Sequence, residues 1–158
     1  MITKPSMAQL LLAMQAELTE KIVPALTDAT LVVNVQMMTA VLGAVAIRAE
    51  HELAWMRDEA DSIERAALDL LDHHLGQGPK AEAAAACLAL YRADLTSSLH
   101  LSEAQGDYDR AGELLSRLAE AAYDGGDDHA IAAVEALMEE RLATEQRIVG
   151  SFIAVGRD

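Results

Sequence analysis

The stretch TLVVNVQMMTAVLGAVAI, residues 30–47, constrains the fold more than any other part of the chain. Residues 29–47 form a run of 19 positions without Asp, Glu, Lys or Arg, between Asp28 and Arg48. That length is within the range of a membrane-spanning helix. A helix that is apolar on all sides is also expected at the centre of a helical bundle, where neighbouring helices cover it. The run is therefore a membrane span, a buried core helix or a surface for a partner.

Polar residues within the run argue against a membrane span. Asn34, Gln36, Thr39 and Gly43 dilute its apolar character, and polar amides are costly in hydrocarbon. No Trp or Tyr flanks its start, and Trp55 lies beyond the charged sequence RAEHE. We predict a protein-core helix, or one shared with a second copy across a two-fold interface, and leave these two alternatives open. Core packing also explains Met37 and Met38, since methionine fills irregular gaps between helices.

Composition favours an all-helical protein in a reducing compartment. Apolar residues make up 52% of the 158 residues but aromatic residues only 3%, which favours close helix packing over a β-sandwich. The net charge of −14 disfavours binding to nucleic acid or to anionic membranes. The single cysteine, Cys87, fits the cytoplasm, and the N-terminal segment lacks the features of a secretion signal. We predict an acidic, soluble, cytoplasmic protein that folds as one domain over residues 1–158.

Apolar residues recur at helical spacing along nearly the whole chain. Breaks are expected at Pro24, at 76–79, at Gly106 and at 125–126, with helix starts capped by Ser6 with Gln9, by Asp28 or Thr30, and by Asp127 or Asp128. We predict an all-α bundle of five or six helices with a long apolar central helix, and leave open whether 28–75 is one helix or two. The expected inward residues are Met7, Leu11, Met14, Leu18, Ile22, Ile63, Ala67, Leu70, Ala84, Leu88, Tyr91, Leu95, Leu99, Leu115, Leu118, Ala122, Ile131, Val134, Met138, Leu142, Val149 and Phe152.

The histidines offer no recognisable metal motif. A carboxylate-bridged di-iron bundle needs Glu three residues before a ligating histidine on two helices. None of the five histidines has Glu or Asp at that position: His51, His73, His74, His100 and His129. Asp69 with His73, and His100 with Glu103, have helical spacing and are interpreted as exposed hydrogen-bonded pairs. We predict no catalytic residue, no metal and no cofactor, and a core role for Cys87.

Two histidines lie on apolar helix faces, His51 between Ile47 and Trp55 and His74 after Leu70. The simpler interpretation is a core histidine hydrogen-bonded to a carbonyl or to a carboxylate such as Glu50 or Asp72. The alternative is a ligand pocket, because an imidazole with a near-neutral pKa serves as acid, base or ligand. The candidate pocket residues are His51, His74, Glu50, Trp55 and Tyr91.

The N-terminal third resembles a known family. PSMAQLLLAMQAELTEKIVPAL, followed by the apolar run and RAEHEL, is similar to a family of small, uncharacterised all-helical bacterial proteins found beside or fused to aminoglycoside-phosphotransferase-like kinases, often near acyl-CoA dehydrogenase genes. The residues that carry the resemblance lie within about the first 55 positions: Leu10, Leu11, Leu12, Glu17, Val23, Pro24, Ala25, Leu26, Arg48, Glu50 and Glu52. The family's usual Asn in the second helix has no clear counterpart, and the chain after Leu95 departs from the family's short ending. The resemblance implies a soluble accessory protein, a partner of a kinase-like or acyl-CoA-metabolism enzyme.

Two functional hypotheses follow. The first is a bacterial, non-catalytic accessory or protein-interaction bundle that forms a homodimer, with neither a nucleic-acid nor a membrane partner. The alternative is a small-molecule-binding or metal-dependent helical enzyme that uses His51 and His74.

Overall fold

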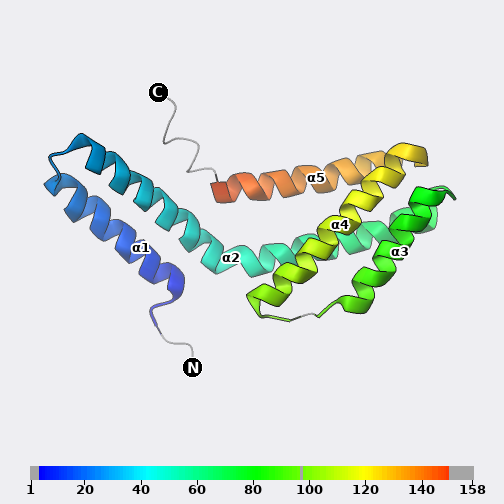
Figure 1. Cartoon of the computed structure of the whole chain (residues 1–158), viewed down its shortest axis with the longest axis horizontal. Helices are drawn as coiled ribbons and strands as arrows, with labels where there is room; N and C mark the ends of the chain where they lie inside the picture. The colour runs from blue at the N-terminus through cyan, green and yellow to red at the C-terminus, as the bar shows by residue number, and fades with distance from the viewer. Residues whose placement is uncertain (1–3, 97, 150–158) are drawn as a thin grey trace. The chain divides into compact units, whose positions relative to one another are not determined.

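A computed structural model describes residues 4–96 and 98–149, and these are all-α (Figure 1). The described residues form the α-helices α1 (Met7–Glu17), α2 (Ala29–His73), α3 (Pro79–Asp94), α4 (Leu101–Gly125) and α5 (Asp128–Val149). A π-helical turn, η1 (Leu18–Ile22), and a 3₁₀ turn, η2 (Val23–Ala25), connect α1 to α2. The predicted all-α bundle with one long apolar helix is confirmed.

The helix termini are fixed by the side chains that the sequence suggests. Ser6 and Gln9 form a reciprocal capping box, with bonds of 2.9 and 3.3 Å between each side chain and the other residue's backbone N–H. Asp28 accepts the Thr30 N–H at 2.8 Å and starts α2, and Asp127 accepts the Ala130 N–H at 2.9 Å and starts α5. Such caps satisfy N–H groups that the first helical turn leaves without partners.

Helix α2 runs without interruption for 45 residues. The sequence left open whether 28–75 was one helix or two, and the structure shows one. No Gly or Pro occurs between Gly43 and Gly76, and charged residues such as those of RDEADS continue a helix well when its next turn supplies an apolar face.

The chain divides into two compact units that share α2 and α5. Unit 1 comprises residues 1–52 and the chain from Thr144 onward; unit 2 is the continuous segment Leu53–Ala143. The single domain expected over residues 1–158 stays a prediction.

Unit 2 contains the hydrophobic core, formed by the second half of α2 with α3, α4 and α5. Its fully buried side chains include Ile63, Leu70, Leu114, Leu118 and Val134. Alanines fill the close approaches between helices, in accordance with the low aromatic content. The core has the following members: Ala60, Ile63, Ala67, Leu70, Leu75, Ala84, Leu88, Tyr91, Ala111, Leu114, Leu115, Leu118, Ala121, Ala122, Ala130 and Val134.

Three expectations for the second half of the chain need correction. Helix α3 ends at Asp94, so Leu99 lies outside it and is 80% exposed. Gly106 is inside α4, which begins five residues earlier, and does not break it. Met138 and Leu142, expected to face inward, are 42% and 54% exposed. Phe152 lies outside the described residues, as does the side chain of Val149.

Unit 1 packs α1 and its following turns against the first half of α2. The Gln15 side-chain amide donates to the Thr39 carbonyl at 3.0 Å. A Cβ on Gly43 would lie 3.0 Å from Gln15 Nε2, so the glycine permits this close approach. The two segments therefore form a helical hairpin held at a polar contact amid apolar side chains.

Most of the apolar run remains exposed in the part of the chain that the structure describes. Of residues 30–47 only Ala44 and Ala46 are buried, and Met37 and Met38 are 47% and 55% exposed. Of the two alternatives left open for this stretch, the described residues do not form an intramolecular core around it, and Met37 and Met38 do not fill gaps between its helices. Among the described residues, α1 and its following turns contact only part of the circumference of this half of α2.

Candidate functional site

The candidate pocket residues are divided between the two units. Glu50 and His51 belong to unit 1, are exposed, and pair with each other at 4.0 Å between Oε2 and Nε2. Trp55, His74 and Tyr91 belong to unit 2. Because α2 is continuous, His51 and His74 are separated by 23 positions, or about six helical turns. That separation along one helix prevents the two histidines from acting on one small ligand.

Within unit 2, Tyr91 and His74 also have different surroundings. Tyr91 is buried, and burial followed by the charges of Glu64 and Asp61 raises the pKa of its phenol. His74 lies just beyond the end of α2, at least ten positions from these carboxylates. The structure does not bring Tyr91 to His74, and His74 instead meets side chains that the sequence analysis did not combine.

His74 lies where two inter-helix turns meet. Its carbonyl accepts the Asp127 N–H at 3.3 Å, and Leu75 forms an isolated antiparallel bridge with Gly126. A Cβ at Gly126 would come within 2.9 Å of atoms of Ala122 and Ala130, so only glycine allows this packing of α4 and α5. The turn after α2 is thus held against the turn before α5.

A cluster of two imidazoles and two carboxylates forms at these turns. The ligand atoms of Asp69, His74 and His129 all lie within 4.8 Å of one another. Asp69 Oδ2 is 4.0 Å from His74 Nε2 and 3.8 Å from His129 Nε2. The two rings are 4.1 Å apart between centroids and tilted by 34°. We call these three residues and Asp127 the turn cluster.

Asp127 orients the His74 ring from the opposite side. His74 Nδ1 lies 2.8 Å from Asp127 Oδ2. The hydrogen bond from His74, together with that from the Ala130 N–H, lowers the pKa of the Asp127 carboxyl. The ring therefore turns Nδ1 toward Asp127, and Nε2 lies on the side of Asp69, 4.0 Å from its Oδ2.

The sequence analysis paired Asp69 with His73, whereas the structure pairs Asp69 with His74 and His129. The histidine held by a carboxylate was correct in kind, but the carboxylate is Asp127 and not Asp72. His129 was passed over because it is 55 positions from His74. The signal that could have found it is the capping aspartate: a helix cap at Asp127 places residue 129 in the first turn of α5.

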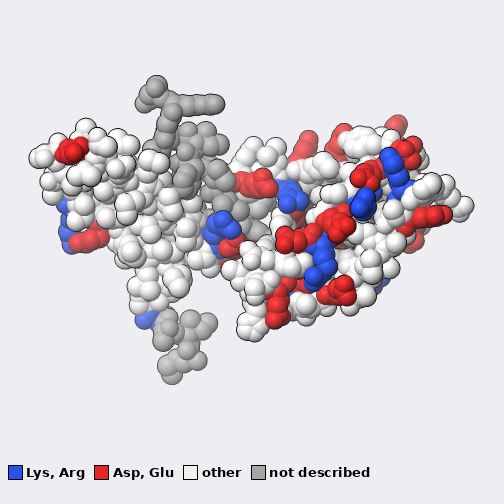
Figure 2. All heavy atoms as spheres, in the orientation of Figure 1, with Lys and Arg blue, Asp and Glu red and all other residues white. Residues whose placement is uncertain are grey.

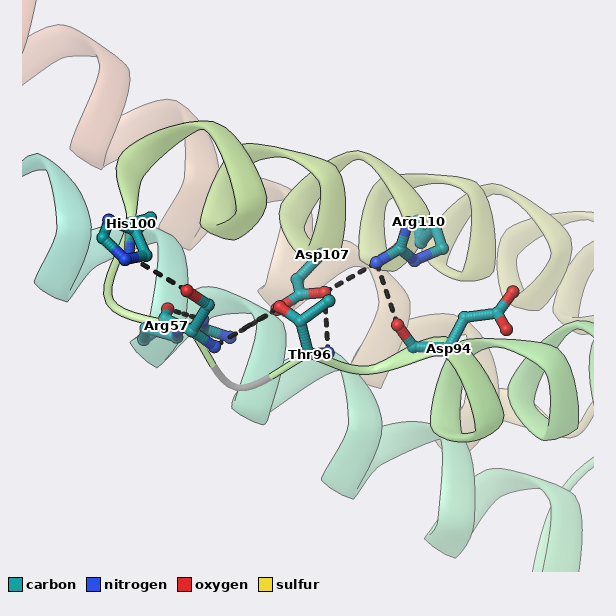
Figure 3. Close-up of polar contacts among 7 residues, drawn as sticks. Arg57, Asp94, Thr96, His100, Asp107 and Arg110 are labelled. Atoms are coloured by element: carbon teal, nitrogen blue, oxygen red, sulfur yellow. Dashed lines mark hydrogen bonds and ion pairs between the residues drawn. The ribbon is translucent and has the colours of Figure 1, made fainter.

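A second polar cluster surrounds the buried carboxylate of Asp107 on α4, which is 1% exposed (Figure 3). It accepts Arg57 Nη1 at 2.8 Å and Arg110 Nη2 at 2.6 Å. The backbone N–H and hydroxyl of Thr96 donate to it at 3.2 and 2.8 Å, and Arg57 also donates to the Ser98 carbonyl. These bonds hold the connection between α3 and α4 against α2. We therefore assign this cluster a structural role.

Unit 1 carries an apolar groove of about 570 Å³ between α1 and α2. Its lining combines long flexible and branched side chains with one carboxylate at its edge: Met14, Glu17, Leu18, Ile22, Met38, Val41 and Leu42. On the face shown in Figure 2, unit 1 is almost free of charged atoms, whereas unit 2 carries many of both signs. The groove can take an apolar side chain or helix face.

Comparison with known proteins adds no relative: no family model, no curated protein and no solved structure matches this chain.

Proposed function

We propose that this protein is a non-catalytic accessory protein of the bacterial cytoplasm that forms a homodimer through unit 1. The observation that carries the proposal is the exposed apolar surface of the hairpin. Twelve large apolar side chains between Met7 and Ile47 are each 40–66% exposed, and α1 has no buried residue at all. They expose on the order of 1,000 Å² together, compared with roughly 800 Å² per partner in a standard stable interface.

The distribution of charge favours a second copy as the occupant of this surface. Residues 1–52 contain three basic and five acidic side chains, a net charge of −2, out of −14 for the whole chain. Two copies that meet through unit 1 therefore join the least charged parts of two acidic molecules. Two hairpins related by a two-fold axis can form a four-helix arrangement, in which each groove receives a helix of the other copy.

Membrane insertion is the competing explanation, since α2 is long and apolar enough to cross a bilayer by length and composition. Its most apolar 18-residue window has a mean hydropathy of 1.9 and is 11% buried. However, Gln15 and Glu17 lie beside the middle of that window, at Thr39 and at the groove of Met38. Insertion of α2 would carry an amide and a carboxylate into the hydrocarbon, at a cost of about 2.5 kcal/mol or more for the charge.

The short uncharged part of α1 is a second observation against membrane insertion. This part, residues 7–16, covers about 15 Å of helix, whereas a bilayer core is about 30 Å thick. The ion pair between Glu17 and Lys21, at 2.8 Å, then follows at once. The hairpin therefore has polar and charged side chains at a depth where a bilayer would be hydrocarbon. A protein interface accommodates such groups, because its rim is polar and accessible to solvent.

The resemblance of the first 55 residues supports an accessory role beside a kinase-like or acyl-CoA-metabolism enzyme. The half-buried single cysteine supports a reducing compartment. We assign the catalytic chemistry to the partner enzyme.

Light scattering after size exclusion, in detergent-free buffer at micromolar concentration, tests the dimer. We expect a dimer for the natural protein and a monomer for Met38→Glu, because the new charge would be buried in the groove. Leu90→Glu is the matched control: Leu90 is an equally exposed apolar residue, 66% exposed, on α3 in unit 2, and this variant should stay dimeric.

Two outcomes would overturn the proposal. A natural protein that is monomeric at these concentrations removes the dimer, and a protein that requires detergent or sediments with phospholipid vesicles favours the membrane explanation. Because Met38 is 55% exposed in the single chain, its substitution should leave the helical content in circular dichroism unchanged.

A further inference from the structure

We propose that Asp69, His74 and His129 form a binding site for a zinc ion at the junction of the two inter-helix turns. This site is independent of the proposed dimer, because all its residues lie in unit 2. It also differs from the pocket expected from the sequence, since of the two histidines expected there it uses only His74.

The donor set is the first argument. Two imidazole nitrogens and one carboxylate oxygen are ligands that zinc takes routinely. Imidazole favours zinc and its neighbours in the first transition row over magnesium and calcium, which prefer oxygen alone. Three protein ligands leave a fourth position of a tetrahedral site to water.

The geometry is the second argument. His74 Nε2 and His129 Nε2 lie 4.0 and 3.8 Å from the same oxygen, Asp69 Oδ2. Ligand atoms around a tetrahedral zinc ion, with bonds of about 2.1 Å, are about 3.4 Å apart. The two carboxylate–imidazole distances must therefore shorten by about half an ångström, and the distance between the two imidazole nitrogens, which lie within 4.8 Å, by up to about 1.4 Å. Asp69 and His129 are 54% and 60% exposed at their side chains, so rotation of these two side chains can supply the movement.

The third argument is that Asp127 prepares His74 for this role. Its carboxylate, 2.8 Å from Nδ1, fixes the ring so that Nε2 faces the other two ligand atoms. Ligating histidines are oriented in this way by a carboxylate on the opposite ring nitrogen. Asp127 is itself held in place as the N-terminal cap of α5, through the Ala130 N–H at 2.9 Å. We therefore assign Asp127 as a positioning residue and the other three as ligands.

The two rings come from different elements, His74 from the turn after α2 and His129 from the first turn of α5, and their centroids lie 4.1 Å apart. A bound ion would then join residues of α2 to the first turn of α5, and we expect it to raise the thermal midpoint of unfolding.

The test is isothermal titration of zinc chloride into protein from which any affinity tag and bound metal have been removed. We expect one zinc ion per chain. His129→Ala and Asp69→Ala should each weaken binding at least tenfold, and Asp127→Asn, which keeps all three ligands, should weaken it about 10- to 100-fold. Magnesium chloride should give no binding heat.

His73→Ala is the matched control, because His73 is an exposed histidine next to His74 and its ring lies 6.2 Å from that of His74. This variant should bind zinc as the natural protein does. The absorption spectrum of the cobalt-substituted protein gives a second readout and should show tetrahedral coordination that His129→Ala abolishes.

The proposal is overturned if zinc produces no stoichiometric binding, which would leave the cluster as exposed ion pairs. Equal weakening by His73→Ala and His129→Ala would also overturn it, because that pattern indicates general attachment to surface histidines. Circular dichroism verifies that each variant remains folded, as expected for exposed side chains.

Discussion

At the residue scale, Asp107 shows how one buried carboxylate organises a connection. Burial alone would raise its pKa, but the hydrogen bonds from Thr96, Arg57 and Arg110 outweigh burial, and the pKa of Asp107 lies below its ordinary value. A carboxyl whose pKa is lowered by folding stabilises the fold above its unfolded pKa, about 3.9. That stabilisation is lost as the pH falls through the folded pKa.

We therefore predict that Asp107→Asn lowers the free energy of unfolding at pH 7 by about 3 kcal/mol, since it leaves Arg57 and Arg110 without their shared anion. The variant should also lose less stability than the natural protein as the pH falls below about 4. Denaturant unfolding at several pH values measures both effects. Asp109→Asn, at an exposed position on the same helix, serves as control, and equal acid sensitivity of Asp107→Asn and natural protein would contradict the assignment.

The turn cluster shows at the same scale why sequence reasoning reached only part of a site. His74 was singled out because it continues the apolar face of Leu70, and the expectation of a carboxylate partner was right. Asp127 and His129 were not reached, because no periodicity links positions on α2 with positions that begin α5. Their proximity depends on which helix ends meet, and a turn contact such as that of Leu75 with Gly126 decides that.

At the scale of elements, the helix starts could be predicted because each depends on a few adjacent residues. Ser6, Asp28 and Asp127 all cap as expected. The breaks were less predictable. Gly106 looks like a stop in sequence, but in α4 it occupies an ordinary helical position, where an added Cβ would make an ordinary contact with Arg110 Nη1 at 3.7 Å. The low helix propensity of glycine is outweighed there, because α4 buries apolar residues both before and after Gly106.

This comparison yields a prediction about two glycines. Gly106→Ala should raise the free energy of unfolding by roughly 0.5–1 kcal/mol, because alanine loses less backbone freedom in a helix. Gly126→Ala should lower it by about 1–3 kcal/mol, because its Cβ would overlap Ala122 and Ala130. Thermal unfolding of the pair measures this, and a loss of stability in Gly106→Ala would show that the position is not a regular part of α4.

At the scale of the whole molecule, the fold class followed from composition and spacing, but the place of the apolar run did not. A helix that is apolar all round looks the same in a sequence whether its cover comes from its own chain or from another. Among the described residues, α1 covers part of the run, and residues such as Val33 and Val41 remain exposed. The number of helices that surround the apolar run depends on how chains assemble, and hydropathy alone does not report that number.

The separation of charge between the units predicts how salt affects the proposed dimer. Residues 1–52 carry a net charge of −2 and the whole chain −14, so association brings two strongly acidic segments into one particle. Salt screens this repulsion, with a Debye length of about 10 Å at 0.1 M. We expect the dissociation constant, measured by sedimentation equilibrium, to fall several-fold between about 0.05 and 0.5 M sodium chloride. A constant that rises with salt would indicate an interface held by ion pairs.

The division of the chain also has a consequence for the order in which the protein folds during synthesis. Unit 2 is one continuous segment, Leu53–Ala143, whereas unit 1 combines residues 1–52 with chain that follows Thr144. As the ribosome delivers the chain from its N-terminal side, the hairpin emerges before unit 2, and the end of α5 that belongs to the same unit emerges after it. The apolar surface of the hairpin is therefore exposed on the nascent chain for as long as unit 2 is being made.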